Sequence, residues 1–152
     1  MSITWKYLDK RSATVDAIKD YNSMKFIIEH TDDGVKAAYE KMGGIRSPQF
    51  DGMPHSHNPQ AAEDRMAKGI EGIDVLRERY RQAAEYMAWF VPAWEELSED
   101  ERYVLETFYS DEERQTDSIY DICDRFHIER TSAYKKKNRA LQKLVTLLYG
   151  KG

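Results

Sequence analysis

The residues best suited to recognition chemistry form one short stripe near the C-terminus. They recur at i, i+1, i+4, i+5 and i+8, a spacing that keeps them on one side of a helix. They are Arg130, Thr131, Tyr134, Lys135 and Asn138. Arginine can bind guanine through two hydrogen bonds, asparagine can pair with adenine, and threonine or tyrosine can contact a thymine methyl group or a phosphate. The stripe therefore favours binding of duplex DNA over catalysis.

A flanking row of cations suits phosphate contacts, which position a protein on DNA without reading the sequence. This row is Lys136, Arg139 and Lys143. The helix N-terminus adds its own partial positive charge. The complete set of predicted DNA-binding residues is Arg130, Thr131, Ser132, Tyr134, Lys135, Lys136, Asn138 and Arg139. Two alternatives remain. The segment is an ordinary solvated helix whose lysines cover its apolar surface, or its charge is neutralised by the acidic helices that precede it.

Charge is distributed unevenly along the 152 residues, although the net charge is only −4. Residues 1–94 are nearly balanced. Residues 95–129 carry 13 acidic and three basic side chains, whereas residues 130–152 carry seven basic side chains and no acidic one. Two explanations stay open: neighbouring helices neutralise each other, or the basic segment binds an anionic partner.

Composition excludes several classes of protein. A single cysteine, Cys123, excludes an internal disulfide framework and a multi-cysteine zinc site, and fits a reducing cytoplasm. No apolar run approaches the roughly 20 residues that span a bilayer, and the N-terminus lacks a signal-peptide core, so we expect a cytoplasmic chain without a membrane partner. The four prolines and eight glycines leave a chain rich in helix formers, which predicts an all-α fold.

No enzyme, cofactor or metal site is expected. Asp51, His55 and His57 could contact a metal, but they lie in a proline-rich loop without a fourth ligand in sequence. His30 is interpreted as a helix-end residue. The glycines at 69 and 72 lie inside a heptad pattern, which argues against a phosphate-binding loop.

Residues 1–94 are predicted to form an antiparallel, coiled-coil-like helical hairpin with a proline-rich loop at about 47–61. Apolar spacings of three and four define its first helix. The seam residues are Tyr21, Met24, Ile28, Thr31, Val35, Ala38, Met42 and Ile45. Ser12 or Thr14 is the expected start, residues 31–34 predict a break or kink, and Gly43 marks the end.

The second helix of the hairpin carries two heptad series. One series is Met66, Ile73, Tyr80, Met87 and Trp94, and the other is Gly69, Leu76, Ala83, Phe90 and Leu97. We interpret both as core rather than as a cofactor site. Pro92 should end or kink this helix near residue 90 or 91.

Residues 95–152 are predicted to form a three-helix module with a helix-turn-helix. Ser98 and Glu101 make a capping box before a helix near 99–110, and Thr116 or Asp117 caps a short helix. Residues 127–129 form the turn before the last helix. The expected inward residues of that helix are Ala133, Ala140, Leu141, Leu144 and Leu148.

These segments resemble region four of bacterial sigma factors. The similarity lies in residues 97–105 (LSEDERYVL), 121–134 (DICDRFHIERTSAY) and 139–144 (RALQKL). The whole chain looks like a phage or prophage regulator of the ArpU/RinA-like type, and residues 50–54 (FDGMP) resemble a short motif of those proteins. Two positions depart from the pattern. His127 replaces a turn glycine, and Lys137 replaces a leucine, so that its amine must extend out of the core.

The resemblance implies a DNA-binding transcriptional regulator of phage late genes that binds promoter DNA and contacts RNA polymerase. The acidic stretch 95–129 is then either a polymerase-facing surface or a set of solvated helices. A homodimer through the hairpin is expected, because paired modules double the phosphate contacts. The alternatives are a non-enzymatic helical assembly protein and a phage DNA-packaging subunit, which also pairs a helix-turn-helix with a coiled coil.

Overall fold

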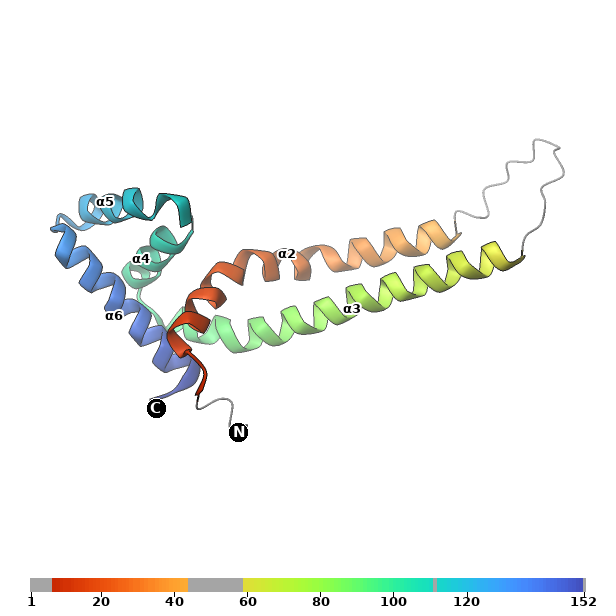
Figure 1. Cartoon of the computed structure of the whole chain (residues 1–152), viewed down its shortest axis with the longest axis horizontal. Helices are drawn as coiled ribbons and strands as arrows, with labels where there is room; N and C mark the ends of the chain where they lie inside the picture. Colours follow the sequence, from red (N-terminus) through yellow and green to blue (C-terminus); the bar gives the residue numbers. More distant parts are fainter. Residues whose placement is uncertain (1–6, 44–58, 111, 152) are drawn as a thin grey trace. The chain divides into compact units, whose positions relative to one another are not determined.

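The computed structural model describes residues 7–43, 59–110 and 112–151, and all regular structure in them is helical (Figure 1). The elements are α2 (Lys10–Gly43), α3 (Pro59–Glu96), α4 (Glu99–Tyr109), the short 3-10 helix η2 (Glu112–Arg114), α5 (Gln115–Phe126) and α6 (Arg130–Tyr149). These ranges contain no strand, which confirms the predicted all-α class. Among the described helices, none combines the length and apolar character that crossing a membrane requires.

The chain divides into two compact units. The first unit comprises Met1–Ser23 and Tyr86–Gly152, and the second unit comprises Met24–Glu85. Both long helices, α2 and α3, therefore contribute to each unit. The boundary at 94/95, which rests on charge and motifs, stays a prediction.

In the second unit α2 and α3 pack side by side in opposite directions. A side chain at Gly69 would collide with the sulfur of Met42, and a Cβ at Gly34 would lie 3.5 Å from a Leu76 methyl group. The Arg77 guanidinium also reaches the Tyr39 hydroxyl at 3.5 Å. Gly69 thus leaves room for the side chain of Met42, a residue of the predicted first seam, whereas a Cβ at Gly34 would make an ordinary contact.

Residues 31–34 do not break α2, which is continuous from Lys10 to Gly43, and the alternative of a kink there stays a prediction. Thr31 is buried and its hydroxyl donates a hydrogen bond to the Ile27 carbonyl one turn earlier. Packing against Leu76 at Gly34 compensates the low helix propensity of this stretch. The interpretation of His30 as a helix-end residue is wrong, since the residue lies inside α2 and its ring stacks on Phe26 with centroids 4.0 Å apart.

The start of α2 differs from the prediction, and α3 ends after Pro92. Helix α2 begins at Lys10 rather than at Ser12 or Thr14, and the Asp9 carboxylate accepts a hydrogen bond of 3.1 Å from the Ser12 N–H. Pro92 does not end α3, which continues to Glu96, and the alternative of a kink near residue 90 or 91 stays a prediction. Ala93, Trp94 and Leu97, which follow Pro92, are buried in the core of the first unit, and this packing supports the last turn.

The proline-rich loop is shorter than predicted at its C-terminal end, because α3 already begins at Pro59, a position where proline is favoured. The rest of the loop, with Asp51, His55, His57 and the motif at residues 50–54, lies outside the described residues.

The core of the first unit is built from the N-terminal part of α2, the last turns of α3, and α4, α5 and α6. Its largest fully buried side chains are Phe90, Leu105, Ile119, Ile122, Leu141, Leu144, Val104 and Thr14. Aromatic rings extend this core: Phe90 stacks on Tyr86 and on Trp94, with centroids 5.2 and 5.5 Å apart. This core fixes the positions of α5 and α6.

The predicted capping box before α4 is confirmed. The Ser98 side chain accepts from the Glu101 N–H at 3.2 Å, and the Glu101 carboxylate accepts from the Ser98 N–H at 3.0 Å. The predicted cap of the next helix is wrong. Helix α5 begins at Gln115 directly after η2, and neither Thr116 nor Asp117 caps it, because both already lie in its first turn.

Candidate nucleic-acid interface

The connection between α5 and α6 consists of three residues with defined backbone geometry. His127 ends α5 in the left-handed region, with φ 54° and ψ 47°, and the Ile128 N–H donates a 3.1 Å hydrogen bond to the Cys123 carbonyl. This is the C-terminal arrangement in which glycine is the usual residue. Glu129, the N-cap residue, has an extended backbone, and α6 begins at Arg130 directly after it.

The inner face of α6 follows the predicted pattern. Ala133, Ala140, Leu141, Leu144 and Leu148 are all buried. Lys137 and Val145 are also buried, and the exposed side chains of the helix point away from this face. No side chain caps the first turn of α6, which leaves its leading N–H groups without a side-chain acceptor from the N-cap residue.

The predicted DNA-binding residues lie on the outer side of α6. Those that are exposed are Arg130, Thr131, Ser132, Lys135, Asn138 and Arg139, whereas Tyr134 and Lys136 are half-buried. The structure brings these eight side chains together over about three turns of one helix. Within α6 no acidic residue interrupts them.

Arg130 and Tyr134 form a pair at the start of this surface. The Arg130 guanidinium lies 5.8 Å from the centroid of the Tyr134 ring. A hydrogen bond with Tyr134 raises the pKa of Arg130 above its ordinary value, with a smaller contribution from Tyr120 on α5. Arg130 therefore stays a cation, and Tyr134 limits its orientations before any partner binds.

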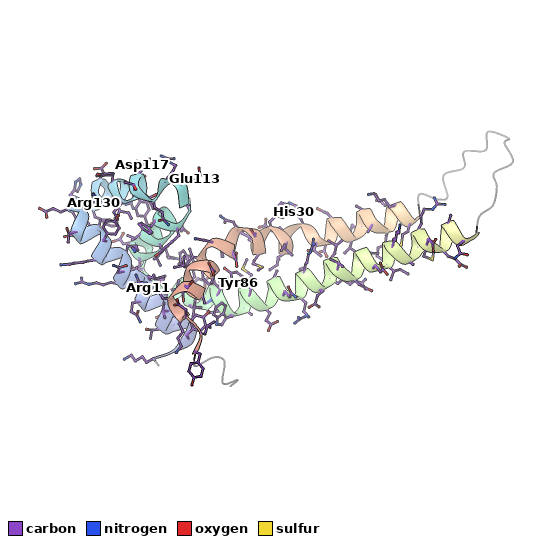
Figure 2. All side chains as sticks on the ribbon, in the orientation of Figure 1. Arg11, His30, Tyr86, Glu113, Asp117 and Arg130 are labelled. Carbon is purple, nitrogen blue, oxygen red and sulfur yellow. The ribbon has the colours of Figure 1, made fainter. Side chains whose placement is uncertain are left out.

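Asn138 is engaged by a residue that the sequence analysis missed. Arg11 of α2, which is labelled in Figure 2, donates a hydrogen bond of 2.8 Å to the Asn138 side-chain oxygen. A two-bond contact with adenine also uses that oxygen as an acceptor, and the oxygen can accept a second hydrogen bond beside that of Arg11. Arg11 in turn adds an exposed cation beside the predicted surface.

Two flanking lysines are held by other groups. The Lys136 ammonium lies 4.4 Å from the centroid of the Phe126 ring on α5. The Lys143 ammonium forms an ion pair of 3.0 Å with Glu101. Lys143 thus has a carboxylate partner in the capping box, and its assignment to the phosphate row stays a prediction. This pair is one case of the acidic and basic stretches neutralising each other.

Lys137 is buried along its stem, whereas its ammonium keeps contact with solvent, as the prediction that the amine extends out of the core requires. The residue is only 9% exposed, and its ammonium lies 4.5 Å from the Phe108 ring centroid, 5.8 Å from that of Tyr134 and 6.0 Å from that of Tyr109. Burial, and to a lesser extent the Arg11 cation, lowers the pKa of Lys137. Three aromatic rings thus lie around a charge that still reaches water.

The described residues contain no group of three or more histidine, cysteine or acidic side chains placed to hold a metal ion. No protein-family model, curated protein or solved structure matches the chain. The case for a function therefore depends on the geometry and the residue pattern of this surface.

Proposed function

We propose that the chain is a DNA-binding transcriptional regulator that places the outer face of α6 in a groove of duplex DNA. The observation that carries the proposal is the surface itself: eight polar or basic side chains on the outer side of α6, which packs into the core through an inner face that is apolar apart from Lys137. The short helix α5 and the three-residue connection brace the start of α6, as in helix-turn-helix proteins. The resemblance to region four of sigma factors supports the same assignment.

Electrostatics supports duplex DNA as the partner. Residues 130–152 carry seven basic and no acidic side chains, and Arg11 adds a further cation beside Asn138. The first turn of α6 lacks a side-chain cap, which suits a phosphate oxygen as the acceptor for its N–H groups. Lys135 and Arg139 are exposed and suited to phosphates, while Arg130 is the best placed to bind guanine.

Regulation of phage late genes and contact with RNA polymerase are proposals that depend on the resemblance alone. A helical assembly protein or a DNA-packaging subunit is the second candidate. It is favoured by the apolar side chains that the second unit exposes, since such surfaces commonly serve association.

Binding of fluorescent duplex DNA by the full chain, measured over a range of salt concentrations, tests the proposal. If about four to six phosphates are neutralised, log affinity should fall against log salt with a slope of about −4 to −5. Sequencing of fragments selected from random duplexes would then identify the preferred site. An assembly protein would oligomerise yet bind no duplex at modest salt.

Single substitutions connect the binding to α6. Lys135→Ala should reduce the salt slope by about 0.9, and Arg130→Ala should in addition reduce the preference at one base pair. Lys68→Ala is the control, because Lys68 is an exposed lysine of α3 in the second unit. Unchanged binding by the first two variants, with helicity retained, would remove α6 as the interface.

A further inference from the structure

The second unit exposes a row of large apolar side chains at regular helical spacing. On α3 the positions 66, 70, 73, 77 and 80 are separated alternately by four and three residues, which keeps them on one side of the helix. Met66 is 55% exposed, Ile70 50% and Tyr80 41%, although Ile73 between them is only 3% exposed. The interpretation of Met66 and Tyr80 as core is therefore wrong for the described chain.

Tyr39 of α2 joins this row. Its hydroxyl accepts a hydrogen bond of 3.5 Å from Arg77, the charged residue within the row, and the tyrosine is 51% exposed. Met66, Ile70, Tyr80 and Tyr39 together define what we name the apolar stripe. With about half of each side chain accessible, the stripe amounts to roughly 400 Å² of apolar surface, as much as the largest patch of a typical monomer.

We propose that the apolar stripe is the contact surface for a second copy of this chain, so that two α2–α3 pairs form a four-helix assembly. The alternation of three and four residues is the spacing that packs side chains between nearly parallel or antiparallel helices. Two stripes meeting would remove roughly 800 Å² of apolar surface from water, about half of the total of a standard interface. The flanking helix surfaces supply the rest.

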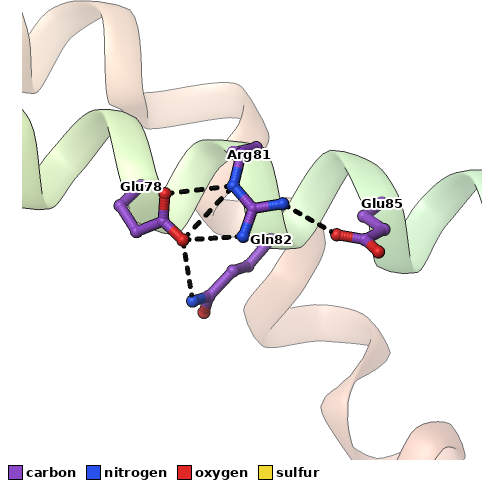
Figure 3. A network of polar contacts seen from close by, with 4 residues as sticks. All are labelled: Glu78, Arg81, Gln82 and Glu85. Atoms are coloured by element: carbon purple, nitrogen blue, oxygen red, sulfur yellow. Dashed lines mark hydrogen bonds and ion pairs between the residues drawn. The ribbon is translucent and has the colours of Figure 1, made fainter. Parts of the chain in front are cut away.

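Charge on this surface favours a copy of the chain over a partner of opposite charge. Arg77 is the single charged residue at the five row positions, and the Tyr39 hydroxyl lies beside it. A surface that meets itself must avoid a strong charge of one sign, because like charges would repel across the two-fold axis. The neighbouring face of α3 carries both signs: Arg81 binds Glu78 at 2.7 Å and Glu85 at 3.0 Å (Figure 3). Such a mixed polar network suits the rim of an interface.

The test compares two substitutions on the same helix of the full chain. Ile70→Glu places a charge in the apolar stripe. Val75→Glu is the matched control, because Val75 is 49% exposed but lies two residues from Ile73, about 200° around α3. Sedimentation equilibrium distinguishes the 17.8 kDa chain from its dimer. We expect a dimer for the native chain and for Val75→Glu, and an increase of about 100-fold in the dissociation constant for Ile70→Glu, since both copies carry the charge.

Each other result overturns the proposal. A native chain that stays monomeric at about 100 µM leaves the stripe to a different partner or to solvent. A dimer that Ile70→Glu leaves intact forms through another surface. Circular dichroism checks that both variants keep their helices. If either glutamate variant loses helicity, Ile70→Ser and Val75→Ser replace them, and equal dissociation constants for these two uncharged variants exclude the stripe. None of these results depends on DNA binding.

Discussion

The guanidinium of Arg11 donates a 2.8 Å hydrogen bond to the side-chain oxygen of Asn138, a residue 127 positions further along the chain. The contact joins the first turns of α2 to the outer face of α6. It gives the candidate interface a cation from outside the basic segment, and it orients the asparagine amide. If α6 binds DNA, Arg11 should contribute to the binding although it lies far from the helix-turn-helix pattern.

Arg11→Ala should weaken binding of duplex DNA by about 3- to 10-fold and reduce the salt slope by about 0.9, because one phosphate contact is lost. Arg11→Lys keeps the charge but not the planar donor pair, so it should keep the slope and lose the coupling to Asn138. Fluorescence anisotropy over a salt series measures both quantities. Native affinity and slope in Arg11→Ala would place Arg11 outside the interface.

The sequence predicted α6 well because its pattern is local. One helix face must be apolar to pack, so Ala133, Leu141 and Leu144 could be assigned to the core and the basic residues to the outside. The same reasoning could not find Arg11, since no periodicity connects residues 127 positions apart. Only packing of α2 in the first unit brings the two together.

The errors also have physical causes. Residues 31–34 are poor helix formers, yet tertiary packing at Gly34 outweighs their propensity. Lys137 extends its ammonium to solvent as predicted, but sequence alone does not reveal that the rings of Phe108, Tyr109 and Tyr134 lie around it. Met66 and Tyr80 follow a heptad pattern as the buried residues do, and periodicity does not distinguish a core from a surface for association.

His127→Gly should stabilise the chain. His127 has φ 54°, a left-handed conformation that costs a residue with a side chain about 1 kcal/mol relative to glycine. Part of that gain is offset because glycine has more freedom in the unfolded chain, so we expect a net increase of roughly 0.5 kcal/mol in the free energy of unfolding. Urea denaturation measures the change. His127→Ala is the control, since alanine keeps the backbone strain and should bring no gain; equal gains in both would assign the effect to the imidazole.

Lys137→Met should also stabilise the first unit. Methionine has a similar volume and no charge to desolvate, whereas burial lowers the pKa of Lys137. We expect a gain of about 1 kcal/mol at pH 7. A native lysine that stabilises more than methionine would mean that the rings hold the ammonium better than water does.

The gain from Lys137→Met should depend on pH with a defined sign. Below the lowered pKa of the folded state, the lysine is charged in both the folded and the unfolded chain, so the native protein bears the full cost of burial. As the pH rises from that value towards about 10.4, the ordinary lysine pKa, the folded chain releases its proton first and the native protein gains stability. The difference between variant and native protein should therefore shrink. The measurement is the free energy of unfolding of each protein as a function of pH. Subtracting one of these plots from the other cancels the titration of the tyrosines, which both proteins share.

The capping box of α4 should depend more on Ser98 than on Lys143. Ser98→Ala leaves the Glu101 N–H without its acceptor and should cost about 1 kcal/mol. Lys143→Met removes an ion pair whose lysine is 47% exposed, so solvent screening should limit the loss to a few tenths of a kcal/mol. Thermal unfolding of the two variants tests the order, and a larger loss for Lys143→Met would contradict it.

Acid should weaken this cap through Glu101. Partial burial would raise the pKa of this carboxyl, but the Ser98 N–H and the Lys143 ammonium outweigh it and hold the pKa below its ordinary value. The stability that the charge provides is therefore fully present above about pH 4.3, the ordinary glutamate pKa, and is lost as the pH falls through the lower folded value. Glu101→Gln keeps an acceptor for the Ser98 N–H and lacks the titrating charge. The native protein should exceed this variant in stability at pH 7, and the two should converge in acid; a constant difference at all pH values would show that Glu101 acts only as a hydrogen-bond acceptor.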